Sequence, residues 1–382
     1  MNIPKLRFKE FTDEWVYYKY KDIFNLNQGL QIPITERFLD YAPNRFFYIT
    51  NEFLKPSSKK SYYIENPSPN VICTKEDILM TRTGNTGKVI TNIAGVFHNN
   101  FFRIKYNPKN FNKDFICCIL NQNKIQNKIL TLAGNSTIPD LNHKDFYSIK
   151  SRFPKLKEQE KIAKFINTVD KKIENIENTI SSLENQKKGL LQQIFSQKLR
   201  FKDENGNNYP NWKENIESIK ILSGNMYPTT SYINKPGILL IQGINITPNK
   251  LLLNDCIYIS NDYNEINHVI VKKGDILLGL NRPLINNQLK ICLFDKDFAY
   301  LYQRAGILSF NKLKINSLFL YQYLQTDSFK KHLQVELVGS DQPYIKSNIF
   351  NKIKLIFPCL EEQTKIADFL SAFDRKLDNQ KA

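Results

Sequence analysis

The chain has 382 residues, enough for two globular domains and a connector. Its 54 lysines and arginines against 37 aspartates and glutamates give a net charge of +17, which favours nucleic acid, before a membrane surface, as a partner. The N-terminus has no signal-peptide pattern and no apolar run is long enough to span a bilayer, so we expect a cytoplasmic protein without a membrane partner.

The chain opens with a segment that occurs twice. Lys5-Leu-Arg-Phe-Lys-Glu10, followed by Trp15, recurs as Lys198-Leu-Arg-Phe-Lys-Asp203, followed by Trp212. The offset between the copies is 193 at this point (198 − 5) and 204 (366 − 162) at the helices described below. A slowly growing offset indicates two copies of one domain with different loop lengths. We assign these domains to residues 1–152 and 198–356.

Each copy has the pattern of a mixed α/β domain. Short apolar runs rich in β-branched and aromatic residues predict strands in matching places, and later runs with helical spacing predict short helices. The expected strands are residues 46–50, 77–81 and 101–105 in the first copy and 238–242, 275–279 and 306–310 in the second; the expected helices are 113–122 and 317–325.

Polar loops in matching places of the two copies are the candidate binding elements. Arg82 can contact guanine or phosphate, and Asn85 can pair with adenine. The second copy carries different side chains in equivalent loops, so the two domains would read different DNA sequences. Ordinary exposed loops are the alternative. The candidate DNA-binding residues are Arg82, Thr83, Asn85, Lys88, Asn99, Asn100, Asn135 and Ser136, and in the second copy Asn281, Arg282, Asn287, Gln288, Gln303, Arg304, Ser340 and Gln342.

Residues 155–197 predict one long helix. Its apolar residues recur at alternating steps of four and three, the period of a coiled-coil seam. The start of this helix recurs near the C-terminus, so we expect two central helices, at 153–197 and 357–382, in a long antiparallel coiled coil; a homodimeric rod is the alternative. The seam residues are Ile162, Ile166, Val169, Ile173, Ile176 and Ile180 in the first helix and Ile366, Leu370, Phe373 and Leu377 in the second, and Lys187 is a charged seam position that can fix the register.

The second central helix is short. It covers only about two of the roughly six heptads of the first. We therefore expect the part of the first helix from Ile180 to Ile194 to lack cover within the chain. Either the second helix is truncated or another chain supplies that surface.

The sequence contains no recognisable set of catalytic residues. The segment Gly84-Asn-Thr-Gly-Lys88 has the wrong spacing for a phosphate loop, and no G-x-G-x-x-G follows a strand. The four histidines and six cysteines have no metal-ligand or nucleophile spacing. We expect a binding protein that is not an enzyme and has no metal or cofactor of its own. A nuclease or methyltransferase would need catalytic residues that the sequence does not reveal.

The duplicated Lys-Leu-Arg-Phe-Lys opening, the Asp-Ile-Leu strands and the two Glu-Gln-x-Lys-Ile-Ala-x-Phe helices resemble the specificity subunit of a type I restriction–modification enzyme over essentially the whole chain. The resemblance implies two target-recognition domains spaced by an antiparallel coiled coil. Each domain would read one half of a split target in double-stranded DNA, and the coiled coil would set the spacer.

The resemblance also implies partners. Two modification subunits would use S-adenosylmethionine to methylate adenine, and two restriction subunits would use ATP and Mg²⁺. The alternative is a coiled-coil adaptor or decoy protein with nonspecific DNA affinity, since an AT-rich genome also raises the lysine content. Target bases and spacer length do not follow from the sequence, because readout also depends on DNA shape.

Overall fold

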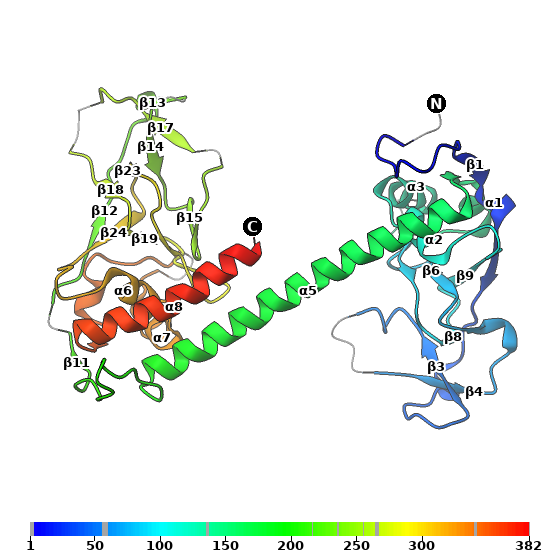
Figure 1. The fold of residues 1–382 in the computed structure, drawn as a ribbon, viewed down its shortest axis with the longest axis horizontal. Coiled ribbons are helices and arrows are strands. Elements are labelled where there is room, and N and C mark those ends of the chain that lie inside the picture. Colours follow the sequence, from blue (N-terminus) through cyan, green and yellow to red (C-terminus); the bar gives the residue numbers. More distant parts are fainter. Residues whose placement is uncertain are drawn as a thin grey trace. The chain divides into compact units, whose positions relative to one another are not determined.

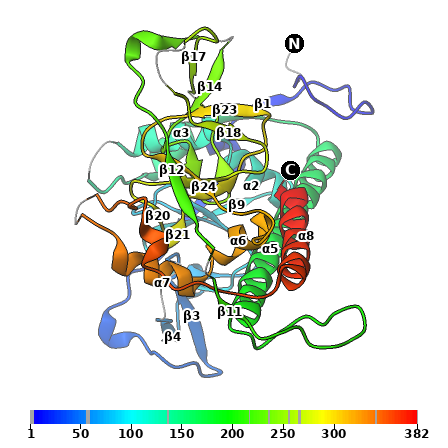
Figure 2. The ribbon, with the colours of Figure 1, turned by 90° about the vertical axis from the view of Figure 1, so that its left-hand side faces the viewer.

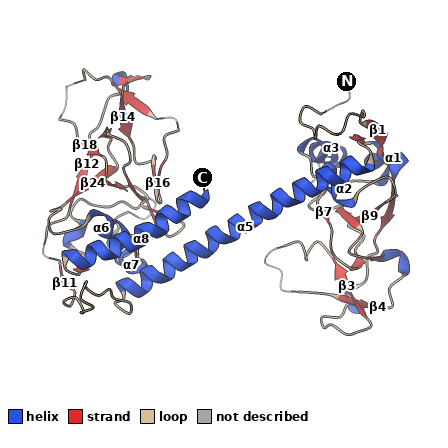
Figure 3. Cartoon of the chain, in the orientation of Figure 1, coloured by secondary structure: helices blue, strands red, loops and turns tan. Residues whose placement is uncertain are grey.

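The computed structural model describes residues 4–55, 60–134, 137–215, 217–234, 237–254, 256–263, 267–339 and 342–381. They form two compact units, Met1–Glu174 and Asn175–Ala382, each of which mixes helices and strands (Figures 1 and 3). The division falls inside the long helix, so that helix contributes to both units. The domain limits expected from the sequence therefore stay predictions.

The first unit contains two four-stranded sheets and a two-stranded ribbon. One sheet is antiparallel throughout, and the other contains one parallel pair, β3 with β8. The sheets have the orders β2-β9-β6-β7 (Phe24–Gln28, Phe101–Tyr106, Ile78–Thr81, Val89–Ile90) and β4-β3-β8-β5 (Tyr63–Glu65, Arg45–Ile49, Gly95–Phe97, Ile72–Cys73), and the ribbon pairs β1 (Val16–Lys19) with β10 (Lys150–Phe153).

Helices cover the first of these sheets. Phe102 of β9, Phe115 of α2 and Phe146 of α4 are buried in one core with Ala163 of the long helix. The helices are α1 (Tyr20–Ile23), α2 (Lys113–Leu120), α3 (Asn123–Ala133), α4 (His143–Ser148) and α5 (Leu156–Phe195), with 3₁₀ turns η1 (Ile34–Glu36) and η2 (Pro69–Val71).

The second unit repeats this architecture. Its sheets have the orders β12-β24-β19-β22 (Lys220–Ser223, Ala305–Ser309, Ile276–Gly279, Ile291–Leu293) and β13-β17-β14-β23-β18 (Tyr232–Ile233, Ile257–Ile259, Ile238–Ile241, Phe298–Leu301, Ile270–Lys272). Three two-stranded pairs accompany them: β11 (Lys213–Glu214) with β25 (Ile356–Phe357), β15 (Ile246–Thr247) with β16 (Lys250–Leu251), and β20 (Leu284–Ile285) with β21 (Gln288–Leu289). Its helices are α6 (Ser317–Tyr323), α7 (Asp327–Glu336) and α8 (Leu360–Lys381), with turns η3 (Thr229–Ser231) and η4 (Ile349–Asn351).

The predicted elements are confirmed. The six expected strands are β3, β6 and β9 in the first unit and β14, β19 and β24 in the second, and the two expected short helices are α2 and α6. The sequence analysis did not identify α3, α4 or α7. The two units share one strand order in the helix-covered sheet, which confirms the duplication.

The Glu-Gln pair at the start of each long helix holds its unit together. Glu158, 2% exposed, accepts hydrogen bonds from Arg7 Nε and Nη2, both at 2.7 Å, and from Trp15 Nε1 at 3.2 Å. The opening segment is thereby fastened to α5. In the second unit Glu362 accepts from Arg200 at 3.1 and 2.6 Å and from Trp212 Nε1 at 3.1 Å.

The glutamine binds backbone groups that would otherwise be unpaired. Gln159 Nε2 donates to the carbonyl oxygens of Asn110 and Pro154 at 3.0 and 2.8 Å, and its Oε1 accepts from the N–H of Asn112 at 2.9 Å. Gln363 makes the same three kinds of contact, with Lys314, Pro358 and Asn316. The repeated Glu-Gln motif is thus explained by buried hydrogen bonds.

Helix α8 lies along the C-terminal part of α5 (Figures 1 and 2). Lys187 Nζ contacts Asp374 Oδ1 at 2.5 Å, and Lys381 Nζ contacts Glu184 Oε1 at 2.7 Å. Residue numbers rise along one helix as they fall along the other, so the predicted antiparallel pairing is confirmed. Of the seam residues, Ile366, Leu370 and Leu377 are buried, and Phe373, Ile162, Ile166, Ile176 and Ile180 are partly buried.

The expectation that α5 lacks cover from Ile180 to Ile194 was wrong. Leu183 and Ile194 are 5% and 0% exposed, whereas Val169 and Ile173, nearer the start of α5, are 40% and 49% exposed. The reason is the direction of pairing. A short helix that runs antiparallel from the second unit meets the end of α5 first.

Reversing the charge of Lys187 should destabilise the α5–α8 pair. Lys187 is 8% exposed, and Lys187→Glu would set a second carboxylate against Asp374. We expect the free energy of unfolding in urea to fall by about 2 kcal/mol, less than for a fully buried pair because Asp374 is partly solvated. Lys187→Glu combined with Asp374→Lys should recover part of the loss. Lys171→Glu, an exposed change on the same helix, is the control; an equal loss there would contradict the assignment.

Candidate nucleic-acid interface

Three segments of the first unit meet beside the end of β6. They are residues 82–88 between β6 and β7, residues 98–100 between β8 and β9, and residues 137–141 after α3; we call them the first interface. The backbone N–H of Arg82 donates to the carbonyl oxygen of Asn100 at 2.7 Å, and the N–H of Leu141 donates to the carbonyl oxygen of Arg82 at 2.9 Å. The structure therefore brings together the predicted loops at Arg82–Lys88 and Asn99–Asn100 and the described part of the third, which follows the predicted Asn135 and Ser136 in the chain.

The guanidinium of Arg82 is held by Asp140. Nε and Nη2 donate to the two carboxylate oxygens at 3.0 and 2.5 Å, and Thr83 Oγ1 donates to the same carboxylate. Burial raises the pKa of the Asp140 carboxyl, but the hydrogen bonds from Arg82 and Thr83 outweigh it and hold that pKa below its usual value. Asp140 uses two of the five N–H donors of the Arg82 guanidinium, so a contact with guanine or phosphate would have to use the remaining donors or exchange this ion pair.

The second unit repeats the arrangement with other residues. The N–H of Leu280 donates to the carbonyl oxygen of Arg304 at 2.9 Å, and the N–H of Ile345 donates to the carbonyl oxygen of Leu280 at 2.9 Å. Leu280 thus takes the place of Arg82, and Arg304 that of Asn100. The second interface comprises residues 280–290, 302–304 and 342–345.

Two arginines of the second interface have left-handed backbones. The φ angle is +44° at Arg282 and +68° at Arg304, and both residues are exposed. This conformation costs most L-residues roughly 1–2 kcal/mol, and such strain gathers at functional sites. Among the described non-glycine residues, the others with positive φ are asparagines and Gln197. Gly84, the counterpart of Arg282, has φ +68°, so the first unit has a glycine where the second presents a guanidinium.

Strands β20 and β21 form a short hairpin in the second interface. Its turn residues Asn286 and Asn287 have φ +48° and +60°, the pattern of a type I′ turn, which matches the twist of the paired strands. Lys330 Nζ donates to the carbonyl oxygen of Asn287 at 3.1 Å. The hairpin presents Asn287 and Gln288, which are both exposed.

The other predicted residues differ in exposure. Asn85, Lys88 and Gln342 are exposed. Asn99 is half-buried and donates from Nδ2 to Gln31 Oε1 at 3.4 Å. Asn281 forms an isolated backbone β-bridge with Tyr344, as Thr83 does with Asp140. Gln303 Nε2 donates to Tyr302 Oη at 3.5 Å. Asn135, Ser136 and Ser340 lie outside the described residues.

The sequence analysis missed three members of the interfaces. Asp140 and Tyr344 occupy equivalent places opposite Thr83 and Asn281, and their offset of 204 (344 − 140), the same as at the central helices, would have matched them. Lys290 corresponds to Lys88. The carbonyl oxygen of Lys290 accepts a hydrogen bond from the N–H of Gly279, the last residue of β19, and the carbonyl oxygen of Lys88 accepts one from the N–H of Thr81, the last residue of β6. Lys290 is 9% exposed, and burial lowers its pKa.

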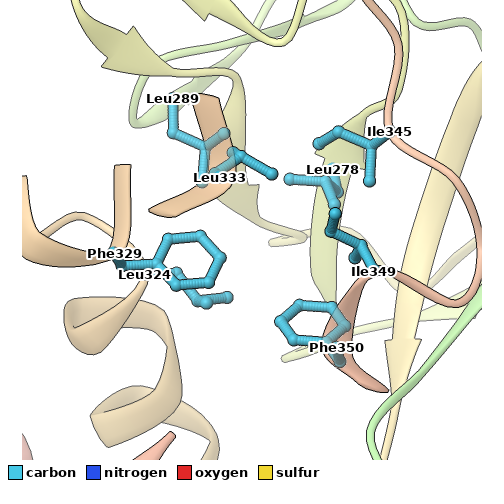
Figure 4. A pocket seen from close by; sticks show the side chains of 8 residues that line it. All are labelled: Leu278, Leu289, Leu324, Phe329, Leu333, Ile345, Ile349 and Phe350. Carbon is cyan, nitrogen blue, oxygen red and sulfur yellow. The ribbon is translucent and has the colours of Figure 1, made fainter. Parts of the chain in front are cut away.

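One apolar pocket is part of a core. Figure 4 shows side chains from β19, α7 and η4, among them Leu278, Leu333 and Ile349, facing one another; all belong to the hydrophobic core of the second unit. Within the described residues, no group of three His, Cys, Asp or Glu side chains could hold a metal ion. None of the described helices is long and apolar enough to cross a membrane.

Comparison with known proteins gives the family. A family model described as "Type I restriction modification DNA specificity domain" matches residues 12–185 and again residues 200–382. The chain belongs to this family. It is therefore a non-catalytic DNA-specificity subunit of a type I restriction–modification system, and each match covers one copy of the duplicated fold.

Relatives of this specificity subunit span its whole length. The MjaVIII specificity subunit of Methanocaldococcus jannaschii is 28% identical over 392 residues, which cover 99% of this chain and 90% of that protein. The putative MjaX specificity subunit of the same organism is 26% identical and covers 98% and 90%. The crystal structure of the S subunit from M. genitalium has the same fold, with a TM-score of 0.65 at 16% identity over 99% of this chain and 94% of that one.

Proposed function

We propose that each interface of this specificity subunit reads one half of a split DNA target. The observation that supports this proposal is that both interfaces use the same backbone hydrogen bonds but present different side chains. The scaffold position held by Arg82 is Leu280 in the second unit, and that held by Gly84 is Arg282. Because the two interfaces share a backbone framework but carry different side chains, each could recognise a different set of base edges.

Affinity would come chiefly from phosphate contacts. The surplus of lysine and arginine supplies a charge of +17, and each neutralised phosphate releases a counterion. Binding should therefore weaken steeply with salt, while the identity of the bound sequence should not change. Two half-sites read by one chain also combine modest affinities through a high effective concentration.

The spacer between the half-sites would be set by α5. This helix runs without interruption for 40 residues from Leu156 to Phe195 and contributes to both units. A continuous helix is much stiffer than a flexible linker, so a target with the wrong spacer would lose one half-site.

We further propose the partners implied by the family. Two modification subunits would bring S-adenosylmethionine and methylate adenine in each half-site, and two restriction subunits would use ATP and Mg²⁺. The target adenine would be flipped into a pocket of the modification subunit. The specificity chain would supply only recognition and positioning, and the cytoplasmic location stays a prediction.

Arg282→Gly should relax the second half-site alone. Glycine adopts the left-handed φ without strain, so the fold should keep or gain stability while the guanidinium is lost. Loss of a bidentate contact to guanine costs about 1–3 kcal/mol, so discrimination at one base should fall roughly tenfold or more. Selection of bound sequences from randomised DNA measures both half-sites at once.

Gln197→Gly is the matched control. It also replaces a residue with positive φ, but it lies two residues beyond the end of α5 and belongs to neither interface. It should leave both half-sites unchanged. An equal loss at both half-sites in Arg282→Gly, or no change at either, would contradict the assignment of Arg282 to one half-site.

A further inference from the structure

One lysine of the second interface is buried without a carboxylate beside it. Among the described residues two lysines are buried, Lys187 at 8% exposed and Lys290 at 9%. Lys187 contacts Asp374 at 2.5 Å. Lys290 forms no ion pair with any residue that the structure describes, and its Nζ donates to the carbonyl oxygen of Asn281 over a long 3.4 Å. The segments 280–290, 302–304 and 342–345 of this interface contain no aspartate or glutamate.

The charge of this lysine is therefore uncompensated in the free protein. Removal from water lowers the pKa of the Lys290 ammonium, and no carboxylate of the described residues raises that pKa again. A buried charge without a counter-charge destabilises a fold, so such groups usually have a charged partner or a function. The described part of the chain does not supply the counter-charge for Lys290.

The fold makes room for the Lys290 side chain. Its N–H donates to the carbonyl oxygen of Pro283 at 2.7 Å, and its carbonyl oxygen accepts from the N–H of Gly279 at 2.8 Å. A Cβ on Gly279 would lie 2.7 Å from Lys290 Cε and 3.1 Å from Nζ, so the glycine lets the lysine lie across the end of β19. In the first unit Thr81 takes the place of Gly279 and is buried, and the counterpart lysine, Lys88, is exposed.

We propose that the Lys290 ammonium binds a phosphate of the DNA that carries the second half-site. A phosphate supplies the negative charge that the chain does not, and an ammonium has three donors, of which the contact with Asn281 uses one. This inference rests on the proposed function of the second interface and assigns one residue a role in it. Lys290 supplies affinity and holds the DNA backbone in position, whereas base recognition belongs to exposed side chains such as Arg282.

Lys290→Met separates a phosphate contact from base recognition. The change nearly keeps the length of the side chain and removes its charge. The affinity of the full chain for a fluorescent duplex with the target selected from randomised DNA should fall about tenfold, which equals about 1.4 kcal/mol. The slope of log affinity against log salt concentration should become shallower by about one. The selected bases should stay the same, in contrast to Arg282→Gly.

The same variant should keep its stability. Because methionine carries no charge that burial would desolvate, the free energy of unfolding of Lys290→Met should be unchanged or higher. A fall would show that the free chain already satisfies the ammonium, and would overturn the proposal. Lys296→Met is the control. It removes an exposed lysine beyond the other end of β22, and it should alter neither the affinity nor the salt slope.

Uncharged phosphates identify the contact directly. In a series of duplexes, one phosphate of the second half-site at a time is replaced by a neutral methylphosphonate. At one position the unchanged chain should lose about tenfold in affinity, while Lys290→Met should lose nothing further there. The same replacements in the first half-site should affect both proteins equally.

Two further results would overturn the proposal. The first is an unchanged salt slope in Lys290→Met, or losses that add to those of the methylphosphonate at every position. The second is an altered base preference at the second half-site, which would assign Lys290 to base recognition or to the positioning of a base-reading side chain. Neither result contradicts the proposed function. That function fails if selection from randomised DNA with the unchanged chain returns no second half-site.

Discussion

Removing one heptad from the middle of α5 should shorten the preferred spacer and leave both half-sites unchanged. Deleting residues 174–180 keeps the seam in register and spares both helix ends, since Asn167 still contacts Asp114 and Lys187 still contacts Asp374. Helix α8 needs no change, because its end lies beside Glu184.

The size of the shift follows from helix geometry. Seven residues shorten a helix by about 10 Å. At about 3.4 Å per base pair, the spacer should shorten by about three base pairs at most, and by less if the helix is inclined to the DNA. Selection from randomised DNA gives the half-sites and the spacer in one measurement.

A length-neutral variant separates spacing from side-chain chemistry. Replacing exposed residues of the same heptad with alanine, such as Glu177 and Asn178, should leave the spacer as it is. An unchanged spacer in the deletion variant would remove α5 as the spacing element. Loss of all sequence preference would instead show that the units do not read DNA independently.

Glu362→Ala should destabilise the second unit strongly. The Glu362 carboxylate is fully buried and accepts from Arg200 and Trp212. Its removal leaves the indole N–H without this partner and leaves the guanidinium only its bonds to the carbonyl oxygens of Tyr209 and Pro210. Breaking such a pair costs several kcal/mol; because Arg200 is about one-fifth exposed and can be solvated, we expect a loss of about 3 kcal/mol. Urea denaturation measures it.

The neighbouring glutamate supplies the control. Glu361 is exposed in the same helical turn, so Glu361→Ala should change the free energy of unfolding by less than about 0.5 kcal/mol. Glu362→Gln keeps the shape of the side chain but removes its negative charge. Its loss in the free energy of unfolding should lie between those of Glu361→Ala and Glu362→Ala. Equal effects of Glu361→Ala and Glu362→Ala would contradict the role assigned to the buried carboxylate.

The sequence was informative wherever a pattern repeats. The strand pairs, α2 and α6, and the two long helices all follow from local periodicity or from the internal repeat. The Glu-Gln motif was recognisable as a repeat, but its role was not, because its partners, such as Arg7 for Glu158, lie about 150 residues away.

The coverage of α5 shows why a seam alone is insufficient. The apolar spacing marked Val169 as a seam residue, yet it is 40% exposed, whereas Leu183 further along the same helix is 5% exposed. The antiparallel direction was predicted correctly, and it already implies that the shorter helix covers the end of α5, so the expected open end was a wrong inference from a correct pairing.

The candidate interfaces were located by their loops but not in detail. Arg82 was expected as a free DNA contact, whereas the structure pairs it with Asp140. The positive φ angles of Arg282 and Arg304 could not be predicted from residue type, because arginine rarely adopts this conformation and no local sequence pattern indicates it. DNA contacts for all these residues stay predictions.

The central claim is that two units of one design read two halves of one split target. The most direct test is long-read detection of methylated adenine in DNA from cells that express this chain with a compatible modification subunit. We predict a single motif with two specified halves and a fixed spacer, and Arg282→Gly should alter one half only. Methylation of a continuous motif, or methylation without sequence preference, would contradict the account.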